Sequence, residues 1–243
     1  MSVSNIRRSF LPLLVICAVF LMILLSSCGG EDAVSVSVHL EYDAENGVLV
    51  DSASGNRYRW ASLSYEPASV GEAYADVQFG EKTVYLYRVG SLSPEKILTE
   101  KFEGAGGLIY EESTPLPALT EMQADKIYVC TMTASETICI DIFEEQELID
   151  SMITLLDQGE QTQLPSELSL SLSLKFASDA HEGIYYNILY AETGDDAADD
   201  HYLYDRGTRK CVRIPEGMFL GILYGELPET ETEELTDTQE VTG

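Results

Sequence analysis

Acidic side chains gather in one short stretch of the chain, between residues 192 and 201. Besides neutral residues, the stretch holds five carboxylates and a histidine: Glu192, Asp195, Asp196, Asp199, Asp200 and His201. Hard cations such as Ca²⁺ take roughly six to eight oxygen ligands, so a loop of this composition could bind one. The spacing does not match an EF-hand, because Ala197 and Ala198 stand where ligands are needed. Two interpretations follow, a Ca²⁺-type site and an ordinary solvated acidic hairpin loop.

A second pair of reactive residues, Cys130 and Cys139, lies in two consecutive strand-like segments. If a two-residue loop at 134–135 joins these segments, residue 130 faces residue 139 across the hairpin. Opposite residues at a non-hydrogen-bonded position approach to ~4.5 Å between Cα atoms, near the short end of disulfide geometry. We therefore predict a disulfide between Cys130 and Cys139 in an oxidising location, with Cys211 left single.

The N-terminal segment has the composition of an export signal. Arg7 and Arg8 precede an almost unbroken apolar run over residues 10–25, and small residues then lead into a cysteine, as Leu25-Ser26-Ser27-Cys28. A membrane-spanning helix is the alternative interpretation. It is disfavoured because Pro12 interrupts the run, whose uncharged core is shorter than the ~20 residues that a spanning helix needs.

Residues 25–28 resemble the lipobox of bacterial lipoproteins, and the layout of the chain is similar to that of uncharacterised surface lipoproteins of Gram-positive bacteria. The resemblance implies that Cys28 receives a diacylglyceryl group and that a signal peptidase removes residues 1–27. It also implies a location at the extracytoplasmic face of the cell membrane, with the membrane held through the N-terminal lipid. Residues 28–33 would then form a short tether.

The charge of the chain limits its partners. The formal net charge is −28, and removal of residues 1–27, which hold Arg7 and Arg8 but no acidic residue, makes the mature chain still more negative. Such a surface repels phosphate backbones and anionic headgroups, so we expect no nucleic acid partner and no electrostatic contribution to anchoring. An unidentified envelope protein or polymer is the expected partner.

Hydrophobic periodicity predicts strands far more often than helices. Apolar residues alternate with polar ones over 34–42 and again over 168–176, where leucines alternate with serines. Residues 144–157 instead show a helical stripe that ends at Gly159, and Ser93-Pro94 predicts a short helix over 94–100. We therefore expect a mainly β or α+β fold, with antiparallel sheets packed against one principal helix at about 144–157.

Composition divides the rest of the chain into three parts. Closely spaced prolines at 113–117 mark a boundary between an N-terminal β-rich half, 34–113, and a C-terminal β-rich half with the helix, 118–225. These halves could be two small subdomains or parts of one domain joined by a crossover loop. Residues 226–243 hold seven acidic residues and no Lys or Arg, so we expect a disordered acidic tail.

Motifs for nucleophilic catalysis are missing from the sequence. It contains three isolated histidines, no Gly-x-Ser-x-Gly elbow and no pair of histidines at zinc-ligand spacing, so no catalytic residue is predicted. The favoured function is a non-catalytic binding or scaffolding domain of the cell envelope. The alternative is a cell-envelope hydrolase or a cation-binding protein that uses the loop at 192–201.

Overall fold

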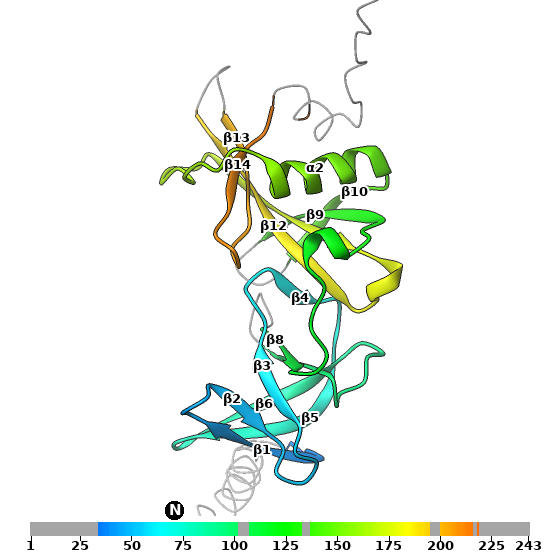
Figure 1. The fold of residues 1–243 in the computed structure, drawn as a ribbon, viewed down its shortest axis with the longest axis vertical. Coiled ribbons are helices and arrows are strands. Elements are labelled where there is room, and N and C mark those ends of the chain that lie inside the picture. Colours follow the sequence, from blue (N-terminus) through cyan, green and yellow to red (C-terminus); the bar gives the residue numbers. More distant parts are fainter. Residues whose placement is uncertain (1–33, 102–106, 133–136, 195–199, 216–217, 219–243) are drawn as a thin grey trace, which may run out of the picture. The chain divides into compact units, whose positions relative to one another are not determined.

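The computed structural model describes residues 34–101, 107–132, 137–194, 200–215 and 218. The described residues from Ser37 onward belong to one compact unit. In the described part of this unit the strands form a closed barrel and a second sheet, which carries an α-helix on one face (Figure 1). The predicted fold class, mainly β with one principal helix, is therefore confirmed.

The barrel has seven strands in the order β1-β2-β3-β8-β7-β6-β5. Its strands are β1 (Val38–Asp43), β2 (Val48–Val50), β3 (Arg57–Trp60), β5 (Val70–Phe79), β6 (Lys82–Val89), β7 (Ile97–Glu100) and β8 (Leu108–Glu111). Alternate residues point inwards, so Leu40, Leu49 and Val77 share one buried cluster with side chains from β3, β6, β7 and β8. Of the apolar residues that alternate over 34–42, Leu40 is buried in this cluster and Val38 packs against it, whereas Val34 and Tyr42 are exposed.

Closure of the barrel departs from the predicted antiparallel pairing. β1 pairs with β5 in parallel, with Val38 opposite Ala75 and Leu40 opposite Val77, whereas the other described strand pairs are antiparallel. A parallel pair needs a long connection, and the chain between β1 and β5 supplies one. Local sequence patterns give no sign of this pairing, because it joins segments far apart in the chain.

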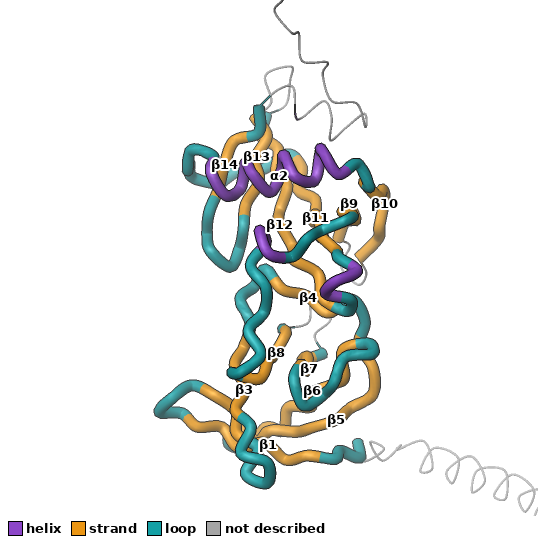
Figure 2. The backbone as a smooth tube through the Cα atoms, turned by 45° about the vertical axis from the view of Figure 1, so that its right-hand side comes forward, coloured by secondary structure: helices purple, strands orange, loops and turns teal. Residues whose placement is uncertain are grey.

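The second sheet runs in the order β10-β9-β11-β12-β13-β14, and β4 pairs with β12 beside that path. Its strands are β4 (Tyr65–Pro67), β9 (Lys126–Met132), β10 (Thr137–Phe143), β11 (Leu170–Ala177), β12 (Ile184–Thr193), β13 (Asp200–Tyr204) and β14 (Cys211–Arg213). One-turn 3-10 helices occur at Leu119–Glu121 and Asp179–His181. β4 belongs to the N-terminal half of the sequence, so the second sheet combines strands from both predicted halves (Figure 2).

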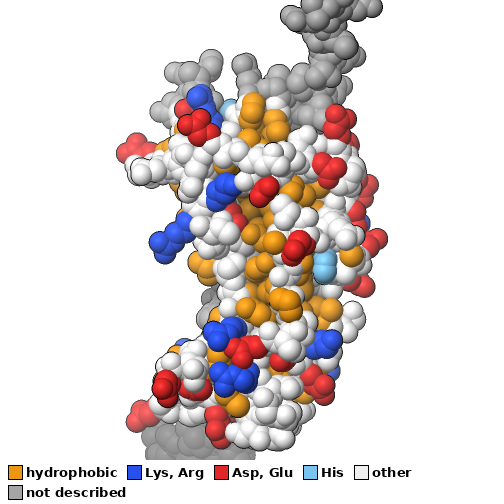
Figure 3. All heavy atoms as spheres, viewed as in Figure 1, with side chains coloured by type: hydrophobic (Ala, Val, Ile, Leu, Met, Phe, Trp, Pro, Cys, Tyr) orange, Lys and Arg blue, Asp and Glu red, His pale blue; other side chains and the backbone are white. Residues whose placement is uncertain are grey.

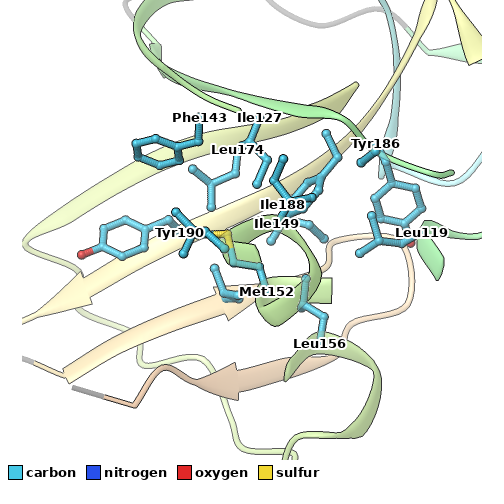
Figure 4. Packing of buried hydrophobic residues seen from close by; sticks show 14 of the residues in the cluster. Leu119, Ile127, Phe143, Ile149, Met152, Leu156, Leu174, Tyr186, Ile188 and Tyr190 are labelled. Carbon is cyan, nitrogen blue, oxygen red and sulfur yellow. The ribbon is translucent and has the colours of Figure 1, made fainter. Parts of the chain in front are cut away.

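The principal helix, α2 (Gln146–Gln158), covers one face of the second sheet. Ile149, Met152 and Leu156 pack against Leu174 and Ile188 of the sheet, as Figure 4 shows. Gly159 ends the helix. Glycines at this position are often left-handed, but the backbone of Gly159 is extended (φ −63°, ψ 154°). Glycine is required there for space, because a Cβ atom would lie 2.4 Å from the Leu155 carbonyl oxygen.

The short helix predicted over 94–100 is wrong, because residues 97–100 form β7. Ile97, Leu98 and Thr99 are all buried, Leu98 in the cluster inside the barrel and Ile97 in a separate cluster that includes Ile184 of β12, and β7 pairs with β6 and β8. Tertiary pairing on both sides thus overrides the local helix-start signal at Ser93-Pro94.

Candidate functional site

The face of the second sheet opposite α2 carries a cluster of polar side chains. Successive residues of a strand point to opposite faces, so Leu174 and Ile188 face the helix while Ser173, Lys175 and Asn187 face away from it. Glu66 reaches the same face from β4, where it lies opposite Tyr185 of β12. We call the four residues Glu66, Ser173, Lys175 and Asn187 the amide cluster.

Hydrogen bonds connect the amide cluster from end to end. Lys175 Nζ lies 2.7 Å from Glu66 Oε2, and Asn187 Nδ2 donates to the other carboxylate oxygen, Oε1. Ser173 Oγ donates to Asn187 Oδ1 over 2.7 Å. A carboxylate only accepts hydrogen bonds, so the Asn187 nitrogen must face Glu66 and its oxygen must face Ser173. The amide is thereby held in a single orientation.

The amide cluster is largely withdrawn from solvent. Ser173 and Asn187 are 7% and 6% exposed, and the side chains of Lys175 and Glu66 are 14% and 16% exposed. Lys175 Nζ also lies 5.8 Å from the centre of the Tyr185 ring. Removing an ammonium and a carboxylate from water is costly, and their attraction often fails to repay it. A stabilising role alone is therefore a weak explanation for this arrangement.

A small cavity of about 70 Å³ adjoins the amide cluster. Ser173 and Asn187 form part of its wall, and the remaining lining residues are Met132, Ser171, Leu172, Leu189 and Arg206. This volume is enough for more than one water-sized molecule. The Asn187 amide thus lies next to a small cavity that is lined by both polar and apolar side chains.

No pattern in the sequence indicates that the four residues of the amide cluster lie together. Its members come from three segments, at 66, 173–175 and 187, that lie 12 or more residues apart, and only strand pairing unites these segments. One signal was present, because Lys175 is the single charged residue in the alternating stretch Leu168–Ala177. A lone charge in the middle of a strand of this kind needs a partner on the same face.

Cys130 and Cys139 lie directly opposite each other on β9 and β10, so the predicted register of this hairpin is confirmed. Both residues are free thiols in the structure, as is Cys211, and the disulfide itself stays a prediction. Burial raises the pKa of the Cys130 thiol, whereas Cys139 is exposed. The loop residues 133–136 lie outside the described residues.

The acidic stretch is only partly described. Glu192 and Asp200 lie at the ends of β12 and β13, while Asp195, Asp196 and Asp199 lie outside the described residues. Asp200 forms an ion pair with Arg213 and accepts a hydrogen bond from Tyr202 over 3.2 Å. Among the described residues no group of three or more His, Cys, Asp or Glu side chains could hold a metal ion. The predicted Ca²⁺ site therefore stays a prediction.

The outer edge of the second sheet is apolar. β10 pairs with β9 on one side, and no described strand pairs with its other side. Ile138, Ile140 and Ile142 are 44%, 56% and 48% exposed. Ile138 lies opposite Thr131 and Ile142 opposite Tyr128, so the bulge between Cys139 and Asp141 turns these isoleucines to different faces. The strand thus offers unpaired backbone groups together with apolar side chains on both faces.

Exposed acidic residues flank this edge. Asp141 lies within β10, and Glu144 and Glu145 follow it directly. None of the three forms an ion pair with any residue in the described part of the chain. Acidic side chains are also scattered over the face shown in Figure 3. The β10 edge therefore carries three carboxylates that attract basic groups.

The predicted lipid-modification residue Cys28, the signal segment 1–27 and the tail 226–243 lie outside the described residues. Within the described ranges, no helix is long and apolar enough to cross a membrane. Comparison with known protein families, with curated protein sequences and with solved structures finds no match.

Proposed function

We propose that the mature chain is a lipid-anchored protein of the extracytoplasmic membrane face, which binds an extended segment of another envelope component without catalysing a reaction. The lipobox-like residues 25–28 support the anchor. The observation that carries the binding role is the unpaired, isoleucine-rich edge of β10. Natural proteins normally protect such an edge with charge or cover, because it is a template for strand addition.

The bound segment adds a strand to β10 and is both apolar and basic. Main-chain hydrogen bonds supply affinity in this mode of recognition, and side chains of alternate residues supply specificity. Apolar side chains of the segment contact Ile138, Ile140 and Ile142. Lys or Arg side chains pair with Asp141 and Glu144, which have no ion-pair partner in the described chain. An acidic segment would be repelled.

A peptide of alternating valine and lysine tests this role, with a valine and glutamate peptide of equal length as its control. The full-length lipidated protein is mixed with each peptide, and backbone hydrogen exchange of residues 137–143 is measured. We expect protection only with the basic peptide, and loss of that protection in Ile140→Glu. Leu63→Glu is the matched control, since Leu63 is 74% exposed but lies outside the second sheet. Equal protection by both peptides, or none by either, would contradict the proposal.

A further inference from the structure

The amide cluster places a primary amine and a side-chain amide against the two oxygens of one carboxylate, away from solvent. We propose that Lys175 and Asn187 form an intramolecular isopeptide bond, with Glu66 as the group that carries protons between them. The product is a covalent link between β11 and β12. This inference is independent of the binding role proposed for β10, because it concerns the opposite side of β9 and a different set of residues.

The strand register brings the two reacting side chains together. Lys175 is the direct cross-strand partner of Asn187, and such residues have Cβ atoms ~4.5–5.5 Å apart. Lys175 Nζ and Asn187 Nδ2 bind the two oxygens of one carboxylate, which holds both nitrogen atoms beside Glu66. Well-oriented intramolecular reactions reach effective molarities of ~10⁵–10⁸ M. Proximity of this kind makes attack on an otherwise unreactive amide feasible.

The hydrogen bonds of the amide cluster match the needs of the reaction. An amine attacks only as the neutral base, and Glu66 can take a proton from Lys175 Nζ across their 2.7 Å contact. Nζ then attacks Cγ of Asn187, and negative charge develops on Oδ1. The Ser173 hydroxyl already donates to that oxygen, so it stabilises the tetrahedral intermediate.

The step balances without any further reactant. The Nζ–Cγ bond forms and the Cγ–Nδ2 bond breaks, while Glu66 passes two protons in succession from Nζ to Nδ2. The leaving nitrogen departs as ammonium, and Glu66 returns to its carboxylate form. Low exposure of Asn187 disfavours attack by bulk water, and the adjoining cavity gives the small leaving group room to escape.

Peptide mapping of the full-length protein tests the bond directly. The protein is extracted from membranes, denatured, reduced and digested with trypsin and then with a glutamyl endopeptidase. Trypsin does not cut after an acylated lysine, and cleavage after Glu182 separates Lys175 from Asn187 along the chain. We expect one branched product that contains both residues and weighs less than the sum of its two pieces by one ammonia. An ion pair without chemistry leaves the mass unchanged.

Substitutions test the roles of Glu66 and Ser173 in forming the bond. Glu66→Gln keeps the size of the side chain but cannot carry the protons, so the branched peptide should disappear. Ser173→Ala should slow its appearance in a pulse-chase experiment by on the order of 10²-fold, as loss of an oxyanion donor does in enzymes. Glu45→Gln changes an exposed carboxylate outside both the amide cluster and the β10 edge and should leave the branched peptide unchanged.

The wild-type digest decides the matter even if a variant fails to fold. Normal tryptic cleavage after Lys175 together with an intact Asn187 amide would overturn the proposal. Conversion of Asn187 to aspartate would overturn it as well, because water and not Lys175 would then be the nucleophile. A branched peptide that persists in Glu66→Gln would remove Glu66 from the mechanism.

Discussion

Asp205 is a buried carboxylate whose environment keeps it ionised. Its Oδ1 accepts hydrogen bonds from Ser64 Oγ and from the backbone nitrogens of Gly207 (2.9 Å) and Thr208 (3.3 Å). Its Oδ2 accepts a bond of 2.7 Å from the Tyr186 hydroxyl. Burial opposes ionisation, but these donors more than offset it and lower the pKa of Asp205 below the usual 3.8. Ser64 precedes β4, so this carboxylate fixes the segment between β3 and β4 to the second sheet.

Asp205→Asn should therefore lower the free energy of unfolding and make it fall less steeply as the pH becomes acidic. The amide presents hydrogens to at least one donor, and an unsatisfied buried group costs about 1–3 kcal/mol. Because the folded-state pKa is lowered, Asp205 stabilises the fold above pH ~3.8, and this contribution is lost as the pH falls through the folded value. Urea unfolding from neutral to acidic pH should show a steeper fall for wild type than for Asp205→Asn. Parallel curves would contradict this account.

The opposed cysteines lead to a prediction about thiol number. Alignment of Cys130 with Cys139 permits a disulfide in an oxidising location, and Cys211 is buried elsewhere on β14. We expect one reactive thiol, that of Cys211, when the oxidised mature protein is denatured and alkylated, and three after reduction. Three reactive thiols before reduction would exclude the bridge. Cys139→Ser should raise the unreduced count by one, since it releases Cys130.

Packing under α2 should dominate the stability of the second sheet. Met152 is fully buried against the sheet, whereas Thr154 on the same helix is exposed. Met152→Ala removes apolar contact and leaves a cavity, so we expect a loss of about 2–5 kcal/mol in the free energy of unfolding. Thr154→Ala is the matched control and should change it by less than about 0.5 kcal/mol. Chemical denaturation measures both, and equal losses would show that α2 is not packed through Met152.

Periodicity in the sequence identifies the helices and strands in which apolar and polar residues recur at a regular spacing. The alternation of leucine and serine over 168–176 predicts β11, of whose apolar face Leu174 and Phe176 are buried while Leu170 is exposed, and the helical stripe predicts α2. The short β7 is missed because both of its faces are buried, so the three consecutive residues Ile97, Leu98 and Thr99 show no alternation of buried and exposed positions. The β1–β5 pair and the amide cluster are missed for another reason, since both depend on contacts between distant segments.

The position of Cys130 opposite Cys139 can be predicted from the sequence, whereas the amide cluster cannot. Cys130 and Cys139 lie on consecutive strands, so turn length alone sets their register. Glu66 reaches Lys175 only because β4, which belongs to the N-terminal half of the sequence, pairs with β12 of the second sheet. The position of β4 is a property of the whole fold. Local propensity therefore contains no information about this contact.

For the chain as a whole, the proposed N-terminal lipid would determine where the protein works. A single acyl chain binds a bilayer only marginally, with an association constant of ~10⁴ M⁻¹, so durable attachment needs more than one chain. The acidic chain cannot add electrostatic attraction to anionic headgroups. Attachment should therefore depend entirely on modification of Cys28.

Cys28→Ala should block lipidation and the cleavage that follows it. The variant should keep residues 1–27 and lack the mass of the lipid, whereas the wild type should begin at a modified Cys28. Ser4→Ala changes a residue before the basic pair and is the control, which should leave processing unchanged. Membrane fractionation with mass spectrometry of the N-terminal peptide distinguishes these outcomes. An unmodified wild-type peptide that still contains Met1–Ser27 would refute the lipid anchor and leave the apolar run as the only means of attachment.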